Sequence, residues 1–278
     1  MTKFLVLGKT GQVASAFAEI LPEACFIGSD ELDLSAPEYV YKKLEELGIT
    51  SEYIINSMAY TAVDKAEDEQ ELCDNINHKS AGEIAKFCAD KNIKLIHYST
   101  DYVFDGNGEK AFQEDNSENL EPLNFYGKTK LAGEKAIQNS GCEYLILRTS
   151  WVYSATGNNF VKTMLKLAEN RDELSIVSDQ IGSPSYALDI ATNTLKLLDQ
   201  NGVYHFVPSE KISWYDFAKM IFEITGIEMN LKSIPTSNYP TPAKRPLNSR
   251  LDSSKTQALG IKFPPIRESL QDCLKRLS

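Results

Sequence analysis

The sequence predicts an α/β protein, with a Rossmann-type doubly wound parallel sheet and a smaller C-terminal α/β domain. Apolar, strand-like runs alternate with helix-period segments through the first half of the chain, which is typical of βαβ units. The first run, residues 4–7, leads into a glycine turn and then a helical pattern. We expect residues 1–150 to form the Rossmann domain and residues 151–278 mainly a second domain, with some segments returning to the first sheet.

Strands are expected where apolar runs are bounded by turn residues, and helices where apolar residues recur every three to four positions. The expected strands are residues 3–7, 24–28, 53–56, 94–99 and 144–150, and the helices between them are residues 12–21, 38–47, 70–91 and 125–139. The pattern is less regular after residue 151, where helices are expected at residues 159–169, 186–199, 214–225 and 266–277. Residues 105–124 are too polar for a core element and are expected to form a long loop.

Composition excludes several classes of protein. A formal net charge of -10 argues against a nucleic-acid partner. No segment approaches the ~18 apolar residues that cross a bilayer, and the N-terminal apolar stretch is too short for a signal peptide. The five cysteines lie far apart in the sequence, without the spacing of a zinc site. We therefore expect no metal and no membrane partner, reduced thiols and a cytoplasmic location.

The glycine turn contains Gly8 and Gly11 and opens the first expected helix. In a dinucleotide-binding fold such glycines allow a tight turn and close approach of the pyrophosphate, which rests on the helix N-terminus. The strict G-x-G-x-x-G pattern is absent, because Gly8 and Gly11 are three residues apart. Asp30 lies about 20 residues further on, where a carboxylate would bind an adenosine ribose. An ordinary strand-to-helix turn and a solvated loop acid remain alternatives.

Tyr126 and Lys130 lie four residues apart in an expected helix, which places both side chains on one face. An adjacent cation favours the phenolate, so we expect the pKa of Tyr126 to be lowered from about 10. Such a phenol suits proton donation during carbonyl reduction. Thr100, where the fourth strand should end, offers a hydroxyl for the same carbonyl oxygen. Because Y-x-x-x-K is common on exposed helices, the pair alone does not indicate a catalytic site. The glycine turn that precedes it in the sequence supports that interpretation.

Four prolines fall within residues 235–246, a density that denies both a helix and a central strand. The segment is either an ordered loop or an interdomain linker. Three cations, Lys244, Arg245 and Arg250, would suit a diphosphate, because guanidinium groups bind phosphate oxygens bidentately. A solvated linker is the alternative.

Taken together, these segments resemble the dTDP-4-dehydrorhamnose reductase family, a branch of the extended short-chain dehydrogenases. The resemblance spans the chain and rests on residues 8–13, 60–67, 97–104, 126–134, 148–153 and 239–251. It implies a Rossmann domain joined to a smaller sugar-nucleotide domain. It also implies reduction of the 4-keto group of dTDP-4-dehydro-L-rhamnose to dTDP-L-rhamnose by NADPH or NADH, the last step of dTDP-rhamnose biosynthesis.

The family pattern implies roles for individual residues. Tyr126 would be the general acid, Lys130 would hold the nicotinamide ribose and lower the tyrosine pKa, and Thr100 would bind the carbonyl oxygen. The expected cofactor-binding residues are Gly8, Gly11, Gln12, Val13, Asp30, Asp33, Leu34, Ala59, Tyr60, Thr61, Tyr98, Tyr126 and Lys130. The expected substrate-binding residues are Thr100, Asp101, Trp151, Arg245, Asn248 and Arg250.

Some questions stay open. Ala16 stands where some family members have a glutamate that helps to bind magnesium at a dimer interface, so the chain is expected to be a monomer or a homodimer without a required metal. Asp30 would repel a 2′-phosphate and favour NADH, whereas Lys9 would accept one. A non-catalytic regulatory subunit is one alternative function. An epimerase or dehydratase is another, because Asp101 adjoins the Thr100 hydroxyl.

Overall fold

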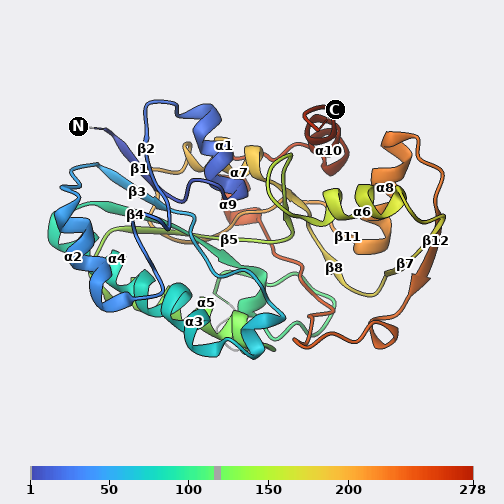
Figure 1. The fold of residues 1–278 in the computed structure, drawn as a ribbon, viewed down its shortest axis with the longest axis horizontal. Coiled ribbons are helices and arrows are strands. Elements are labelled where there is room, and N and C mark those ends of the chain that lie inside the picture. The colour runs from blue at the N-terminus through green and yellow to red at the C-terminus, as the bar shows by residue number, and fades with distance from the viewer. Residues whose placement is uncertain (1, 116–119, 278) are drawn as a thin grey trace.

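The computed structural model describes residues 2–115 and 120–277 of the 278-residue chain. Within these residues, six parallel strands form the main sheet in the order β2-β1-β3-β4-β5-β10 (Figure 1). The strands are β1 (Phe4–Leu7), β2 (Cys25–Ile27), β3 (Tyr53–Asn56), β4 (Lys94–Thr100), β5 (Tyr144–Thr149) and β10 (Gly202–His205). The strand order reverses between β1 and β3, and this is where open α/β sheets bind ligands, beyond the carboxyl ends of the strands.

Helices cover both faces of this sheet (Figure 1). On one face lie α1 (Gln12–Ile20) and α7 (Ala187–Thr194), whose apolar side chains pack with those of the strands into one core cluster. On the other face lie α2 (Pro37–Glu46), α4 (Ser80–Lys91) and α5 (Phe125–Asn139), around a second cluster. The strands are buried on both faces, which explains their continuous apolar runs. The predicted fold class is therefore confirmed.

The helix expected at residues 70–91 is present but not continuous. It consists of α3 (Gln70–Asp74), a π-helical turn (Asn75–Lys79) and α4. The turn lies against α5, where a side chain at Gly133 would collide with the carbonyl oxygen of Asn77. The other expected helices and strands of the first half occur within a few residues of their predicted bounds.

The second half of the chain builds a smaller layer around a third core cluster, on the right of Figure 1. Its helices are α6 (Phe160–Ala168), α8 (Trp214–Thr225) and α10 (Ile266–Lys275), and α9 (Ser254–Ala258) follows β10. Its strand pairs are β7 (Glu173–Val177) with β12 (Asn230–Ile234), β8 (Ile181–Gly182) with β11 (Ile212–Ser213), and β6 (Val152–Tyr153) with β9 (Ser185–Tyr186). None of these strands was predicted. Most are short, and β12 is mainly polar and exposed.

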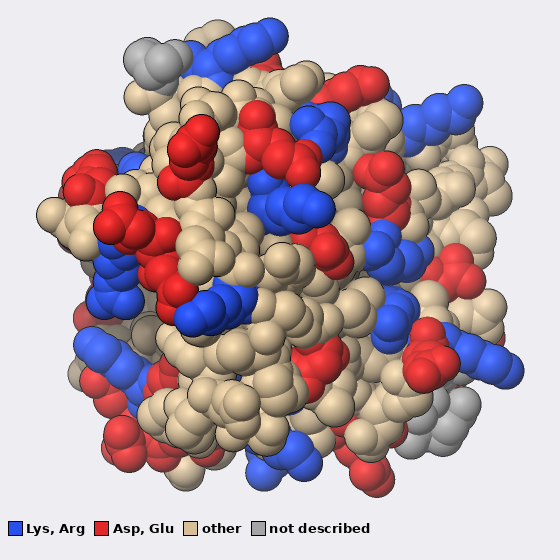
Figure 2. Space-filling view, turned by 90° about the vertical axis from the view of Figure 1, so that its right-hand side faces the viewer, with Lys and Arg blue, Asp and Glu red and all other residues tan. Residues whose placement is uncertain are grey.

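Basic and acidic side chains are interspersed on the face of the smaller layer that Figure 2 shows. No helix in the described part of the chain is long and apolar enough to cross a membrane.

The proline-rich segment is an ordered loop rather than a free linker. It contains a short 3₁₀ turn (Thr236–Asn238), and the backbone N–H of Ala243 donates to the Asp64 carboxylate at 3.1 Å. Further along the chain, Asn248 forms an isolated parallel β-bridge with Ile181. Leu251 forms another with Phe112, which lies in the loop expected at residues 105–124. Residues 116–119 of that expected loop lie outside the described residues.

A buried ion pair joins α5 to the sheet. Arg148 on β5 binds both carboxylate oxygens of Glu134 on α5, at 2.9 Å and 2.7 Å, and both side chains are almost fully buried. The Ser99 hydroxyl on β4 donates to the same carboxylate at 2.5 Å. One carboxylate therefore ties a helix to two adjacent strands.

Replacing Glu134 by alanine is expected to destabilise the protein by about 3–5 kcal/mol, because it leaves the Arg148 charge buried without its partner. Urea denaturation followed by circular dichroism measures this change. The control is Glu223→Ala, which breaks the half-exposed pair with Arg267 and should cost about 1 kcal/mol or less. Equal losses in the two variants would show that burial does not decide the contribution of the Glu134 pair.

Candidate active site

Four predicted site residues meet at the carboxyl edge of the main sheet. Thr100 ends β4, and Asp101 begins the 3₁₀ turn (Asp101–Val103) that follows it. Tyr126 and Lys130 lie in the first turns of α5. Tyr126 and Thr100 interact through their side chains, and the Asp101 charge also acts on the phenol. The pattern that predicted one helix face thus brings these residues to one place.

The start of α5 is fixed by a side-chain cap. The Asn124 side-chain oxygen accepts from the Gly127 N–H at 2.9 Å, and its amide donates to the Lys244 carbonyl at 2.9 Å. Because Gly127 has no side chain, the start of α5 can lie close to the backbone of Tyr102. A Cβ on Gly127 would collide with the carbonyl oxygen of Tyr102. The first helical turn, which carries Tyr126, therefore presses against the turn after Thr100.

The pKa of Tyr126 is raised above its ordinary value rather than lowered. Burial is the main cause; the Asp101 charge adds to it, and the interaction with Thr100 opposes it. The expected lowering by Lys130 does not occur, since Lys130 is not among the groups that shift this pKa. A buried phenol keeps its proton at neutral pH. Tyr126 is therefore a proton-holding acid.

The Lys130 ammonium points to the strand beneath it. Lys130 is 2% exposed, and its Nζ donates to the Tyr98 carbonyl at 2.7 Å and lies 3.2 Å from Nε2 of His97. Burial lowers the pKa of Lys130 to about 8, against the opposing charge of Glu134. Nδ1 of His97 lies 3.2 Å from the Asn56 amide, so the imidazole bridges β3 to the lysine.

Sequence analysis assigned no role to His97, although it lies in the recognised segment 97–104. Burial lowers the pKa of His97, and the Lys130 charge lowers it further, so the ring is neutral. A titratable side chain directly after the apolar pair Leu95-Ile96 of a buried strand was the signal for it. His97 and the Tyr98 carbonyl together fix where the Lys130 ammonium lies.

Asp101 has an unused oxygen. The Thr100 hydroxyl donates to Asp101 Oδ1 at 3.0 Å, whereas Oδ2 is buried and has no hydrogen-bond partner among the described residues. Burial raises the pKa of Asp101 to about 6, and hydrogen bonding to Ser249 and Thr100 limits the rise. Buried polar atoms are normally paired. The unpaired oxygen beside Thr100 is therefore a costly feature of the kind found at functional sites.

The glycine turn leaves room at the N-terminus of α1. Gly8 has φ +120°, a backbone conformation that favours glycine. Gly11 caps α1, and a Cβ on it would meet no atom within 4 Å. The first helical N–H groups are therefore open to an anion, as a dinucleotide pyrophosphate requires.

The next two expected cofactor residues have their side chains engaged within the protein. The Gln12 side chain forms hydrogen bonds with Val152, Ser154 and Asn159, and the Val13 side chain packs against the core.

The loop after β3 is joined to α5 by one side chain. Asn77 accepts from the Tyr60 N–H at 2.9 Å, donates to the Tyr60 carbonyl at 3.0 Å, and contacts the Thr129 hydroxyl at 3.2 Å. Thr129 in turn donates to the Tyr126 carbonyl at 2.8 Å. Ala59, Tyr60 and Thr61 therefore lie close to the first turns of α5, and Thr61 is exposed.

Other expected cofactor residues have side chains engaged elsewhere. The Tyr98 hydroxyl lies 2.8 Å from the Thr194 hydroxyl in the opposite helix layer, so Tyr98 serves the site through its carbonyl. Leu34 is 2% exposed and packs in the core. Asp33 accepts from the Ser35 N–H at 2.8 Å. The Asp30 side chain is 74% exposed and lies 4.0 Å from Lys9, whose closer partner is Glu31.

The expected substrate residues of the proline-rich loop have intramolecular partners. Arg245 pairs with Asp64 at 2.7 Å. Asn248 is 1% exposed; its amide donates to the carbonyls of Asn107 and Lys110, and its side-chain oxygen accepts from Arg250. Asn248 thus orients Arg250 and has no side-chain group left exposed. Trp151 follows β5 and is half-buried.

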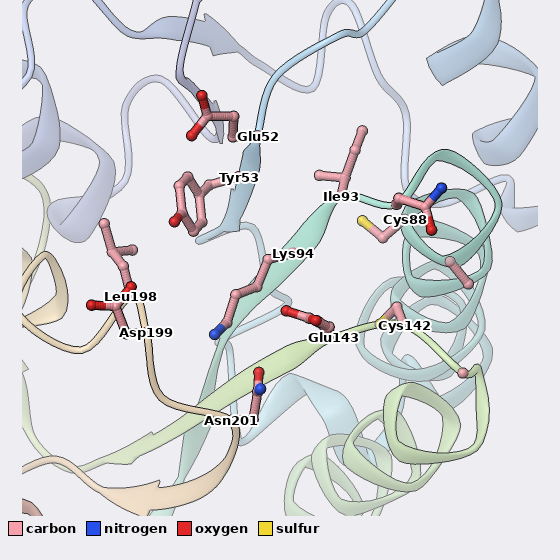
Figure 3. A pocket seen from close by; sticks show the side chains of 13 residues that line it. Glu52, Tyr53, Cys88, Ile93, Lys94, Cys142, Glu143, Leu198, Asp199 and Asn201 are labelled. Atoms are coloured by element: carbon pink, nitrogen blue, oxygen red, sulfur yellow. The ribbon is translucent and has the colours of Figure 1, made fainter.

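Two other features lie apart from these residues. Ala16 is 8% exposed on α1, one turn before Glu19, which pairs with Arg276 at 2.8 Å. A pocket of about 420 Å³ opens at the opposite, amino edge of the sheet, with Lys94 between Glu143 and Asp199 (Figure 3). None of its lining residues is among the predicted site residues. No group of three His, Cys, Asp or Glu residues suited to a metal is found in residues 2–115 and 120–277.

Comparison with known proteins points to one enzyme. The family model described as "RmlD substrate binding domain" matches residues 2–278. The dTDP-4-dehydrorhamnose reductase of Escherichia coli (strain K12) is 44% identical over 273 residues, covering 91% of this chain and 90% of that protein. The Salmonella typhimurium (strain LT2) enzyme of the same name is 42% identical over 276 residues, with 91% and 90% covered. A crystal structure of dTDP-4-dehydrorhamnose reductase from Bacillus anthracis in complex with NADP has a TM-score of 0.92 at 34% identity, covering 99% of each chain.

Replacing Asp101 by asparagine is expected to stabilise the protein above pH 7 by about 2–3 kcal/mol and to have little effect below pH 4. The reason is that the pKa of Asp101 is raised to about 6. Its folded pKa exceeds the unfolded value, so the wild type loses stability as pH rises between about 4 and 6. Urea denaturation at several pH values tests this. A difference between the variant and the wild type that does not change with pH would contradict the buried-charge explanation.

Proposed function

The chain belongs to the dTDP-4-dehydrorhamnose reductase family, and from this premise we propose that Thr100, Tyr126 and Lys130 form its catalytic centre. The chain is an NAD(P)H-dependent oxidoreductase that reduces dTDP-4-dehydrorhamnose in dTDP-rhamnose biosynthesis. The substrate proposed in full is dTDP-4-dehydro-L-rhamnose, and the product is dTDP-L-rhamnose. The observation that carries the catalytic assignment is the interaction of Tyr126 with Thr100 beside the unpaired oxygen of Asp101.

The proton donor in this proposal is Tyr126. The reduced nicotinamide supplies a hydride to the carbonyl carbon when it is bound. As negative charge develops on the carbonyl oxygen, Tyr126 transfers its phenolic proton to that atom. The raised pKa of Tyr126 keeps this proton in place until the oxygen becomes basic. The Thr100 hydroxyl beside Tyr126 needs only a rotation about its C–O bond to become the second donor to the same oxygen.

Thr100 and Asp101 act on the substrate in this proposal. The Thr100 hydroxyl, which donates to Asp101 in the structure, turns its proton to the carbonyl oxygen. Asp101 Oδ1, which the Thr100 hydroxyl then releases, is proposed to accept from a sugar hydroxyl group. The Arg250 guanidinium, oriented by Asn248, is proposed for the diphosphate.

Lys130 is proposed to bind the ribose next to the nicotinamide, while Tyr98 and His97 fix its position. The proposed cofactor-binding residues otherwise remain those expected from the sequence, with Tyr98 acting through its carbonyl group. The open N-terminus of α1 suits the pyrophosphate of NADPH or NADH.

The division into residues 1–150 and 151–278, the cytoplasmic location and a monomeric or homodimeric state remain our proposals. The five free cysteines support a reducing compartment. The retained Tyr126, Lys130 and Thr100 argue against a non-catalytic subunit.

Tyr126→Phe is expected to lower kcat by at least about 100-fold and to leave cofactor affinity nearly unchanged, since only the acidic oxygen is removed. The assay follows reduced-nicotinamide absorbance with enzymatically generated dTDP-4-dehydro-L-rhamnose and identifies the product. The control is Tyr41→Phe on α2, which removes a hydroxyl bonded to Asp90 on α4 and should keep full activity. Near-normal turnover in Tyr126→Phe would remove that residue from the acid role.

The same assay on the wild type tests the reaction itself. Oxidation of NADH or NADPH only in the presence of the sugar, with dTDP-L-rhamnose as product, is the expected result. Cofactor binding without oxidation would favour the regulatory-subunit alternative. Conversion of the sugar without net oxidation of the cofactor would favour an epimerase or dehydratase.

Cofactor choice is expected to depend on the acidic residues around Lys9. A weak preference for NADH is expected in the wild type. Asp30 would repel a 2′-phosphate, and Glu31 forms an ion pair with the Lys9 ammonium, which would otherwise bind that phosphate. Glu31→Gln should raise kcat/KM for NADPH relative to NADH by about two- to fivefold. Glu46→Gln, at the far end of α2, serves as the control. A large NADPH preference in the wild type would refute the expectation.

A further inference from the structure

Trp151 has an unusual backbone conformation. Its φ is +49°, in the left-handed region that bulky side chains rarely adopt. Such conformations persist where the surrounding structure imposes them, and they cluster at functional sites. Trp151 directly joins the end of β5 to β6, and its carbonyl accepts from the Ser185 N–H at 3.2 Å.

One face of the Trp151 indole is covered by Trp214. The two rings are nearly parallel, at 7°, with centroids 3.6 Å apart. Trp214 is the first residue of α8, whose start is fixed by a capping box between Ser213 and Asp216. Phe160 packs on Trp214 with ring centroids 4.5 Å apart. Trp214 is therefore a fixed surface for Trp151.

The other face is covered by the backbone of Gly182. A Cβ on Gly182 would lie 2.6 Å from Cε2 of Trp151, 2.8 Å from Cζ2 and 2.9 Å from Nε1. Cε2 lies between the other two atoms and is recessed from the ring edge. An approach in the ring plane would therefore meet Cζ2 and Nε1 first, so Gly182 lies over a face. Trp214 is not among the nearest atoms, so this is the face away from Trp214.

Gly182 and Trp214 together form what we call the indole slot. Gly182 lies on β8, and Trp214 directly follows β11, whose Ile212 pairs with Gly182. With both faces covered, the indole can meet a ligand only along its edge. Its Nε1–H donates to no described residue and is not among the buried unpaired atoms, so it is open to an acceptor from a ligand.

The indole slot lies beside the proposed sugar site. Ile181, the neighbour of Gly182, accepts from the Ser249 N–H at 2.8 Å, and the Ser249 side chain interacts with Asp101. On the other side, Thr149 pairs with Thr100, two residues before Trp151. Trp151 is thus connected to both substrate-facing residues through short, paired segments.

We propose that Trp214 and Gly182 are positioning residues for the sugar: they clamp Trp151 so that its edge, and not a face, meets the hexose. This inference rests on the proposed function for the identity of the sugar. A clamped edge supplies one N–H donor at a fixed place, which suits a ring or hydroxyl oxygen. It also limits the width of the site and so contributes to sugar specificity.

A spectroscopic signature of the slot exists because Trp151 and Trp214 are the only two tryptophans in the chain. Two indoles stacked at 3.6 Å couple their electronic transitions and give a circular-dichroism couplet when their transition dipoles are neither parallel nor perpendicular. Trp151→Phe and Trp214→Phe should each abolish this couplet in the full-length protein. A spectrum unchanged by either substitution would overturn the slot.

Addition of saturating dTDP-L-rhamnose separates an edge contact from a stacking contact. If Trp151 stays clamped, the couplet is retained in the complex. Loss of the couplet would show that the indole leaves Trp214 to stack on the sugar, and that result would overturn the proposal. The measurement needs no turnover, so it stays informative about the free protein if the proposed reaction fails.

Kinetics supply the second test. Trp214→Ala is expected to raise KM for the nucleotide sugar about 3- to 10-fold, the loss expected for one aromatic pair, with KM for NADPH unchanged. Trp214→Phe should restore most of the affinity, because a ring still covers the indole. Gly182→Ala should raise the same KM, because its Cβ invades the opposite face. Equal effects on sugar and cofactor KM, or no recovery with phenylalanine, would indicate a merely structural role and overturn the proposal.

Discussion

The position of α5 depends on one buried ion pair, and the proposed active site depends on the position of α5. Glu134 receives two hydrogen bonds from Arg148 on β5 and one from Ser99 on β4. These bonds fix the rotation of the helix as well as its distance from the sheet, because they converge on one carboxylate. Tyr126 lies two turns before Glu134 on the same helix, so its place opposite Thr100 follows from that anchor.

Burial has opposite consequences for the acids and the bases of the site, and both favour the neutral form. It raises the pKa of Tyr126 and of Asp101, and it lowers the pKa of Lys130 and of His97. The pKa values of Lys130 and Asp101 therefore lie closer to neutral pH, where a charged or polar ligand shifts their protonation more readily. A low local dielectric also strengthens any hydrogen bond to an oxygen that acquires charge during the reaction.

Much of the fold, and the place where the proposed catalytic residues meet, could be predicted because both depend on local pattern. Alternation of apolar runs and helical periods located five strands of the main sheet, and helical spacing placed Tyr126 beside Lys130. The direction of the Tyr126 pKa could not be predicted in this way, since it depends on burial by residues distant in the sequence. Two further features were also missed: the hydrogen bonds that tie Asn248 to the neighbouring loop, and the bond from Lys130 to the Tyr98 carbonyl. A sequence motif does not show which atoms already have hydrogen-bond partners. The strand pair β7–β12 escaped prediction because β12 carries few apolar residues.

The π-helical turn at Asn75–Lys79 keeps the helical segments on both sides of it in phase with the core. One additional residue in a regular α-helix would rotate everything downstream by about 100°, whereas one wide turn absorbs that residue locally. Cys73 before the turn and Ala81 after it are both fully buried. The wide turn therefore lets Asn77 leave the regular helical path while the apolar side chains before and after it stay in the core.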